Sequence, residues 1–133
     1  MCSRTVLIVE DEPLIRMMLA DALCNEGYSV IEAATALEAI AVLGTKEVRA
    51  VVTDIDMPGG LSGLDLTRYV ASYRKGLPVI VTSGGHLLRQ EELPDNARFI
   101  AKPYKLRQIL DMLLEILAAG ASAEANVSRL RVA

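Results

Sequence analysis

Five short apolar runs, each followed by a segment of helical period, constrain the fold of this chain more than any other feature. The runs cover residues 6–9, 28–31, 50–52, 79–81 and 99–101. Several of them are continuous rather than alternating, as expected for strands that are buried on both faces of a parallel sheet. A regular alternation of strand and helix favours a parallel sheet that carries helices on both faces.

The segments between the runs have apolar residues at the spacing of one helical face, i, i+3, i+4 and i+7. Four such stripes are predicted to face the core: Leu14, Met17, Met18 and Ala22; Ala36, Ala39, Ile40 and Leu43; Leu66, Tyr69, Val70 and Tyr73; and Leu106, Ile109, Leu110, Leu113, Leu114 and Leu117. A shorter helix is predicted over residues 87–93.

Helix boundary residues agree with this division. Thr35 with Glu38 and Ser62 with Asp65 have the spacing of capping boxes. Four glycines stand where helices should end: Gly27, Gly44, Gly76 and Gly120. The prediction is one α/β domain over residues 1–120, a doubly wound five-stranded parallel sheet of five strand-helix units, flavodoxin-like, with strand order 2-1-3-4-5. Residues 121–133 are predicted to form a short C-terminal tail that frays.

Composition argues against several classes of function. A chain of 133 residues with 52% apolar residues can bury a core without disulfides. With 4% aromatic residues, no tryptophan and a net charge of −3, nucleic acid is not an expected partner. Cys2 and Cys24 lack metal-ligand spacing and are interpreted as reduced thiols of a cytoplasmic protein. No run reaches the roughly 18 apolar residues of a membrane-spanning helix, and we expect no signal peptide.

Polar side chains follow four of the five predicted strands, at the point where each strand ends. These are Glu10-Asp11-Glu12, Asp54-Ile55-Asp56, Thr82-Ser83 and Lys102-Pro103. The second strand instead ends in Ala33-Ala34, which offers no such group. Open parallel sheets bind ligands beyond the carboxyl ends of their strands, so we expect the four polar segments to converge there.

The convergence would crowd like charges, which is costly unless a cation neutralises Glu10, Asp11 and Asp54. Mg²⁺ suits such a site because it takes carboxylate oxygens and keeps waters or phosphate oxygens as its other ligands. Lys102 would add a positive charge toward phosphate, and Ser83 a neutral donor. A carboxylate can itself be the nucleophile of phosphoryl transfer, and metal and lysine would stabilise the transferring group.

The four segments resemble the receiver domain of two-component response regulators, in a single-domain, CheY-like form. Residues 6–12 look like the family's first strand and acidic pair, and residues 54–58 look like its phosphoacceptor segment. Residues 78–84 are similar to its fourth strand, with Ser83 in the hydroxyl position, and residues 99–103 to its fifth. The resemblance covers residues 5 to about 119.

The resemblance implies that Asp54 accepts a phosphoryl group from a phosphohistidine on a sensor histidine kinase or a histidine phosphotransfer protein. It implies Mg²⁺ held by Asp11, Asp54 and the backbone carbonyl of Asp56, with Glu10 direct or through water. Lys102 and Ser83 would hold the phosphoryl oxygens. The chain would then be a signalling phosphoacceptor that assists its own phosphorylation and dephosphorylation, rather than an enzyme, and would signal through a downstream effector protein.

The family also implies a conformational switch, in which Ser83 moves toward the phosphate and an aromatic residue, here Phe99, turns inward. A fixed core position for Phe99 is an equal alternative. The bond between Lys102 and Pro103 is expected to be cis. Met112 and Ile116 widen the apolar face of the last helix, either as core contacts or, with the fifth strand, as a surface for a partner or a homodimer.

Three departures from the family pattern stand out. The loop between Pro58 and Gly63 is one residue longer than usual, and Glu10 replaces the commoner Asp. Gly84-Gly85 predicts a flexible loop after the fourth strand, with His86 on its surface.

Three alternatives remain at this point. A haloacid-dehalogenase-type phosphatase would use Asp54 as nucleophile and Asp56 as acid-base, but its motif usually follows the first strand and has no proline where Pro58 stands. A flavodoxin-like cofactor binder would need a phosphate cradle after the first strand, where the acidic segment would repel phosphate. A pseudo-receiver would never be phosphorylated, yet the acid, hydroxyl and lysine set is complete here.

Overall fold

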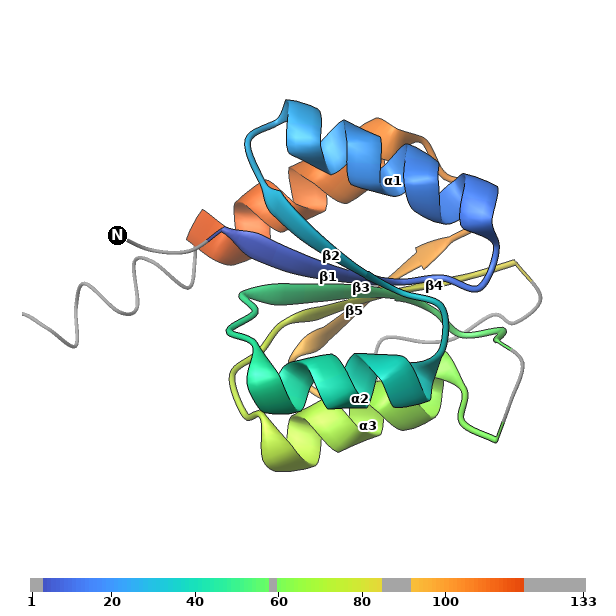
Figure 1. Cartoon of the computed structure of the whole chain (residues 1–133), viewed down its shortest axis with the longest axis vertical. Helices are drawn as coiled ribbons and strands as arrows, with labels where there is room; N and C mark the ends of the chain where they lie inside the picture. Colours follow the sequence, from blue (N-terminus) through green and yellow to red (C-terminus); the bar gives the residue numbers. More distant parts are fainter. Residues whose placement is uncertain (1–3, 58–59, 85–91, 119–133) are drawn as a thin grey trace, which may run out of the picture.

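A computed structural model describes residues 4–57, 60–84 and 92–118. All five predicted strands are present, and each is five residues long: β1 (Thr5–Val9), β2 (Ser29–Ala33), β3 (Ala50–Asp54), β4 (Val79–Ser83) and β5 (Ala97–Ala101). They pair in parallel in the order β2-β1-β3-β4-β5 (Figure 1), which confirms the predicted topology.

Helices cover both faces of the sheet, as a doubly wound fold requires (Figure 1). α1 (Pro13–Asn25) and a C-terminal helix over residues 106–118 lie on one face. α2 (Ala36–Thr45) and α3 (Gly63–Tyr73) lie on the other. Most of the helix predicted over residues 87–93, Gly120 and the predicted tail fall outside the described residues. No helix in the described ranges is long and apolar enough to cross a membrane.

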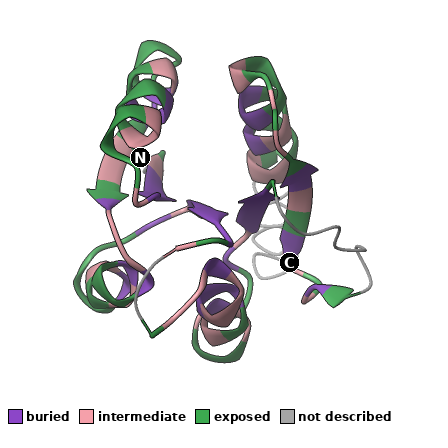
Figure 2. Cartoon of the chain, turned by 90° about the vertical axis from the view of Figure 1, so that its right-hand side faces the viewer, coloured by how far each residue is buried: buried purple, intermediate pink, exposed green. Residues whose placement is uncertain are grey.

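Two hydrophobic clusters, one on each face, form the core. Successive strand residues alternate between them, so Leu7 and Val9 belong to the cluster beneath α2 and α3, and Val6 and Ile8 to the cluster beneath α1. β3 and β4 are buried along their whole length. In Figure 2 the strands in the middle of the sheet are coloured as buried, whereas the helices on either side are partly exposed. Side chains at the ends of these two strands are therefore attached to fully buried main chain.

The strands extend further toward the polar residues than the apolar runs predicted. β3 ends at Asp54 and β4 at Ser83, whereas the runs stopped at Val52 and Val81. Parallel pairing carries the ladder beyond the apolar residues, because Asp54 lies opposite Thr82, and Ser83 opposite Ala101. Asp54 and Ser83 are consequently part of the hydrogen-bonded sheet, and their main chain is held by its pairing.

The predicted core face of α1 is wrong. Leu14 is 65% exposed and Met17 and Met18 are each 51% exposed, whereas the buried residues of the helix are Leu19, Ala20 and Leu23. This helix has apolar residues on most of its circumference, so two overlapping stripes satisfy the helical period equally well. Docking against the sheet, and not the period, selects the stripe that is buried. Two single positions in other helices were also wrongly predicted to face the core: Tyr73 of α3 and Leu114 of the C-terminal helix are exposed.

The predicted helix boundaries are largely confirmed. Ser62 and Asp65 form a complete capping box at the start of α3. Thr35 caps α2 by accepting from the Glu38 amide, but the Glu38 carboxylate accepts from the Ala34 amide, so the predicted box closes one residue earlier. Gly27 and Gly76 have positive φ angles, of 93° and 88°, beyond the ends of α1 and α3. Gly44 does not end α2, which continues to Thr45.

Gly63 brings α3 into direct contact with the end of β3. Its amide donates to the Ile55 carbonyl at 3.0 Å, and a Cβ atom added there would lie 1.9 Å from the Asp54 carbonyl oxygen. The contact involves main chain on both sides, so no flexible side chain could yield. Only glycine allows α3 to begin so close to Asp54.

We therefore expect Gly63→Ala to lower the free energy of unfolding by about 2 kcal/mol or more, because the added methyl forces backbone apart. Gly44→Ala is the matched control, since no atom lies within 4 Å of the added Cβ and the residue is helical. It should raise the free energy of unfolding by about 0.5–1 kcal/mol. Urea unfolding measures both variants, and equal stabilities would contradict this account.

Candidate functional site

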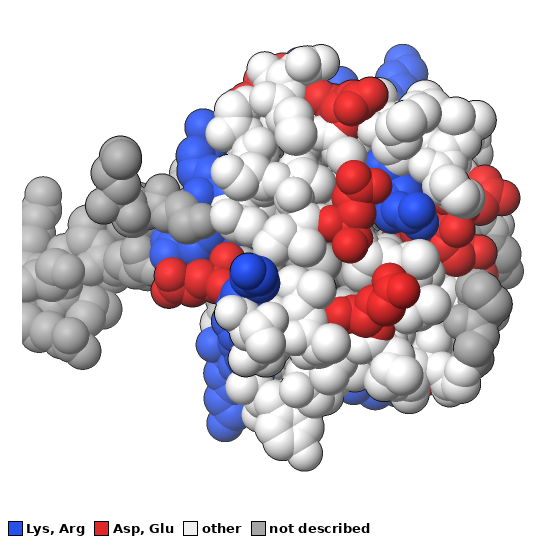
Figure 3. All heavy atoms as spheres, viewed as in Figure 1, with Lys and Arg blue, Asp and Glu red and all other residues white. Residues whose placement is uncertain are grey.

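The polar ends of β1, β3, β4 and β5 meet at the carboxyl edge of the sheet, as predicted. The Lys102 ammonium donates to Asp54 Oδ2 at 3.0 Å and lies 3.8 Å from Glu10 Oε1. Carboxylate oxygens of Glu10, Asp11 and Asp54 lie within 4.8 Å of one another. Figure 3 shows that acidic and basic side chains also lie side by side on the molecular surface toward this edge, whereas Glu10 and Asp54 themselves are buried. Residues that are more than 90 positions apart in the sequence thus form one site.

Main-chain pairing holds Glu10, Asp54 and Lys102 in place. Glu10 follows β1 directly, and its amide donates to the Ala33 carbonyl of β2 at 3.0 Å. Asp54 is the last residue of β3 and is 5% exposed. The Lys102 amide donates to the Ser83 carbonyl at 2.9 Å, which extends the pairing of β4 and β5 by one residue. The Lys102-Pro103 peptide bond is cis, as expected.

Lys102 remains a cation in this setting. Burial on its own would lower the pKa of the Lys102 ammonium, but the hydrogen bond to Asp54 and the negative charges of Asp54 and Glu10 outweigh burial and raise that pKa. A fixed positive charge therefore stands directly against the Asp54 carboxylate.

The surroundings of Glu10 in the acidic group raise the pKa of its carboxyl. Only 2% of its surface is exposed, and burial, followed by a hydrogen bond with the Asp11 side chain, raises the pKa of Glu10 to about 7. The nearby charge of Lys102 lowers this pKa but does not restore its ordinary value. A further cation beside the carboxylates would relieve the conflict and favour the ionised form.

The donor set fits a hard divalent cation. Three carboxylates from two neighbouring strand ends each offer one oxygen within the same small volume. Mg²⁺ prefers oxygen ligands and commonly binds through one or two carboxylates. Glu10, Asp11 and Asp54 could therefore hold Mg²⁺, which agrees with the metal predicted from the sequence.

Asp56 and Ser83 make a contact that the sequence analysis missed. Ser83 Oγ donates to Asp56 Oδ2 at 3.3 Å, and the Asp56 amide donates to Asp54 Oδ1 at 3.4 Å. The resemblance to receiver domains implies a role for the main-chain oxygen of Asp56 and none for its side chain. No spacing signal predicts a side-chain contact between the ends of β3 and β4, because it depends on the rotamers of both residues.

Two further sequence predictions concern residues away from the carboxylates. Phe99 is half-buried and packs against the cluster beneath α2 and α3. Met112 and Ile116 are partly buried against the opposite cluster, which favours core contacts as their role. Pro58 and His86 lie outside the described residues.

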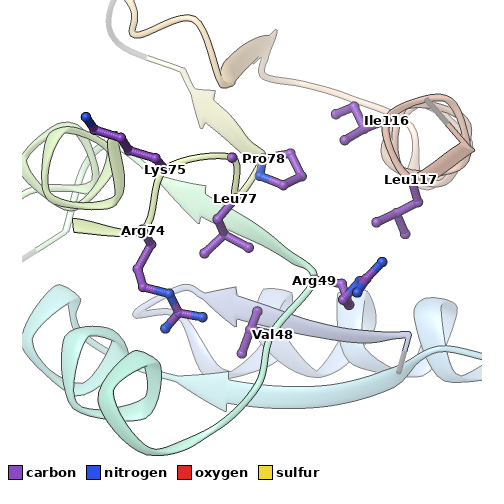
Figure 4. Close-up of a pocket in the computed structure, with 9 residues that line it drawn as sticks. Val48, Arg49, Arg74, Lys75, Leu77, Pro78, Ile116 and Leu117 are labelled. Atoms are coloured by element: carbon purple, nitrogen blue, oxygen red, sulfur yellow. The ribbon is translucent and has the colours of Figure 1, made fainter. Parts of the chain in front are cut away.

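Among the pockets in the part of the chain that the structure describes, one adjoins the site. A pocket of about 520 Å³ lies between α1 and the start of the C-terminal helix, with Ile15, Met18 and Leu106 on its walls and Lys102 on one side. A pocket of about 320 Å³ lies at the amino edge of the sheet and has Arg49, Arg74 and Lys75 around it (Figure 4). Those three side chains point in different directions and do not converge on one ligand position.

Comparison with known proteins agrees with this geometry. The family model for the response regulator receiver domain matches residues 6–114. The chain is 36% identical over 120 residues to sensor kinase CckA of Brucella abortus (strain 2308), covering 86% of this chain and 13% of that protein. It is 33% identical over 114 residues to transcriptional regulatory protein PdtaR of Mycobacterium tuberculosis (strain ATCC 25618 / H37Rv), covering 80% and 53%. The chain thus spans about half of one relative and a small part of the other.

A solved structure supports the same assignment. The CheY-like response regulator receiver domain protein of Methanospirillum hungatei JF-1 has a TM-score of 0.83 and 27% identity to this chain. The alignment covers 92% of this chain and 99% of that one. With a family match over most of its length, a parallel sheet of the expected order and acidic, hydroxyl and lysine side chains at its carboxyl edge, this chain belongs to the response regulator receiver domain family.

Proposed function

We propose that Asp54 is the phosphoacceptor of this receiver and takes a phosphoryl group from a phosphohistidine in a reaction that requires Mg²⁺. The observation that carries the proposal is the 3.0 Å contact between the Lys102 ammonium and Asp54 Oδ2 at the edge of the acidic group. A carboxylate placed between a fixed cation and a cation-binding group can be both nucleophile and anchor for transferred phosphate.

In the transfer, a carboxylate oxygen of Asp54 bonds to phosphorus as the bond from phosphorus to the donor histidine nitrogen breaks. The electron pair of the broken bond goes to that nitrogen, and the product is an acyl phosphate. Lys102 offsets the added negative charge, and the Ser83 hydroxyl is placed to donate to a phosphoryl oxygen after it leaves Asp56. Mg²⁺ held by the acidic group would offset negative charge on the phosphoryl oxygens during transfer.

The metal ligands in this proposal are the carboxylates of Asp11 and Asp54 and the main-chain carbonyl of Asp56. Glu10 binds directly or through water. The mutual proximity of Glu10, Asp11 and Asp54 supports this assignment. Ser83 and Phe99 would change conformation on phosphorylation and so alter the protein surface. Ser83 is buried at the end of β4, next to the end of β3, and Phe99 lies on the neighbouring strand β5.

The proposed partners are a sensor histidine kinase or a histidine phosphotransfer protein as donor, and an effector protein as recipient of the signal. The relatives support a place in such a pathway, since one is named a sensor kinase and another a transcriptional regulatory protein. β5 and the C-terminal helix form the proposed effector or homodimer face.

Incubation with acetyl phosphate and Mg²⁺ tests the phosphoacceptor directly. Intact mass spectrometry should show one added phosphoryl group on the wild-type chain and none on Asp54→Asn, because an amide cannot form the acyl phosphate. EDTA should abolish the gain. An unmodified wild type, or an equal gain on Asp54→Asn, would refute the proposal and favour a pseudo-receiver.

Asp56→Ala separates the phosphoacceptor from a phosphatase that uses Asp56 as acid-base. The variant keeps the main-chain carbonyl, so we expect it to gain one phosphoryl group under the same conditions. Freeing Ser83 from its bond to Asp56 should leave the extent of phosphorylation within about threefold of wild type, in line with loss of one weak hydrogen bond. Hydrolysis of a small phosphate ester over many turnovers, lost in Asp56→Ala, would contradict the proposal.

Proton and metal should compete at Glu10, because burial raises the pKa of its carboxyl to about 7. Below this pH Glu10 is neutral and repels no other carboxylate, whereas above it the ionised group attracts Mg²⁺. The apparent Mg²⁺ affinity should therefore rise by up to about tenfold from pH 6 to pH 8. Amide NMR titrations with Mg²⁺ measure it, and Glu10→Gln should flatten the dependence. If the Mg²⁺ affinity of Glu10→Gln rises as steeply with pH, the proton that competes with Mg²⁺ is bound by a group other than Glu10.

A further inference from the structure

Arg16 connects two groups that no motif relates to each other. Its Nη1 donates to the Glu10 main-chain carbonyl at 2.7 Å, and its Nε donates to Glu32 Oε1 at 3.2 Å. Arg16 lies on α1, and Glu32 lies on β2, opposite Ile8 of β1. The Arg16 side chain is 20% exposed, so most of it is held against the protein rather than in solvent.

The carbonyl that Arg16 holds belongs to the turn from which two of the three site carboxylates project. Glu10 and Asp11 stand in this turn between β1 and α1. The main chain of Glu10 is tied to β2 twice, by its own amide to the Ala33 carbonyl and by its carbonyl through Arg16 to Glu32. The edge strand β2, which contributes no group to the site itself, therefore determines where the turn lies.

We propose that Arg16 is a positioning residue for the metal site, which it serves by fixing the Glu10 carbonyl and thereby aiming the Glu10 and Asp11 carboxylates toward Asp54. The inference rests on the proposed Mg²⁺-dependent function. Three carboxylates that repel one another would push the turn away from β3 unless something rigid opposed them. A planar guanidinium with two differently directed donors resists that movement, which a single flexible ammonium does less well. Outer partners of this kind commonly change metal affinity by about 10–100-fold when removed.

A purely electrostatic role for Arg16 makes the opposite prediction. Removing a positive charge close to the carboxylates should strengthen binding of a divalent cation, because one source of repulsion is lost. Removing a positioning group should weaken binding, because the carboxylates are no longer held together before the metal arrives. The sign of the change in Mg²⁺ affinity therefore distinguishes the two roles.

The test is an amide NMR titration with Mg²⁺ alone, at pH 8, on the full chain. Arg16→Gln should raise the Mg²⁺ Kd by about tenfold. Arg107→Gln is the matched control: Arg107 also bridges acidic side chains, Glu26 and Asp111, but contacts no residue of the site in those pairs. Its Kd should stay within twofold of wild type. A rise of threefold or more in Arg16→Gln alone supports the proposal, and a smaller rise, a fall, or an equal rise in Arg107→Gln overturns it.

A second pair of variants decides the question if Arg16→Gln does not fold. Glu32→Gln and Glu32→Ala remove the same charge from a residue that is about half exposed. Only Glu32→Gln keeps an oxygen that can accept from Arg16. The Kd of Glu32→Ala should exceed that of Glu32→Gln by threefold or more, and equal values overturn the proposal.

Failure of the proposed function gives a different result. If the wild-type chain shows no Mg²⁺ binding at all, both the proposed function and the role of Arg16 are refuted. If wild type binds Mg²⁺ and is phosphorylated on Asp54 while Arg16→Gln binds as well as wild type, only the positioning role is refuted.

Discussion

Carboxylates held close together at the end of a buried sheet are the constraint on which the rest of this structure depends. Glu10, Asp11 and Asp54 repel one another, and Glu10 and Asp54 are almost fully buried. Such an arrangement is costly in water-poor surroundings unless a cation and rigid supports offset it. Lys102 supplies one cation by direct contact with Asp54, and the remaining conflict appears as the raised pKa of Glu10. The arrangement of these carboxylates is compatible with binding of a further cation.

The supports come from main chain more than from side chains. β3 and β4 are buried throughout, and Asp54 and Ser83 are part of their pairing. The main chain of both residues is therefore fixed by the sheet. α3 begins against the carbonyl of Asp54, where only Gly63 fits. On the other side of the site, contacts to β2 hold the turn after β1. A strand that contributes no side chain to the acidic group, β2, thus contacts the turn that carries two of its carboxylates.

Much of the site could be predicted from the position of polar residues after apolar runs. Parallel strands end at one edge, so Glu10, Asp54 and Lys102 had to approach one another once the strand order was known. The contacts of Arg16 with Glu10 and Glu32, and of Ser83 with Asp56, could not be predicted in this way. They depend on how far α1 is rotated about its axis and on individual rotamers, which have no counterpart in residue spacing.

By itself the sequence determined the number of strands, their parallel pairing and the edge at which the site forms, because continuous apolar runs must be buried on both faces and crossovers of one hand leave few topologies. Tertiary structure alone decided which face of α1 is buried. Its apolar residues surround most of the helix, so Leu14, Met17 and Met18 satisfy the period yet lie exposed, while Leu19 and Leu23 meet the sheet. Where several faces of a helix are equally apolar, only packing against its neighbours can select one.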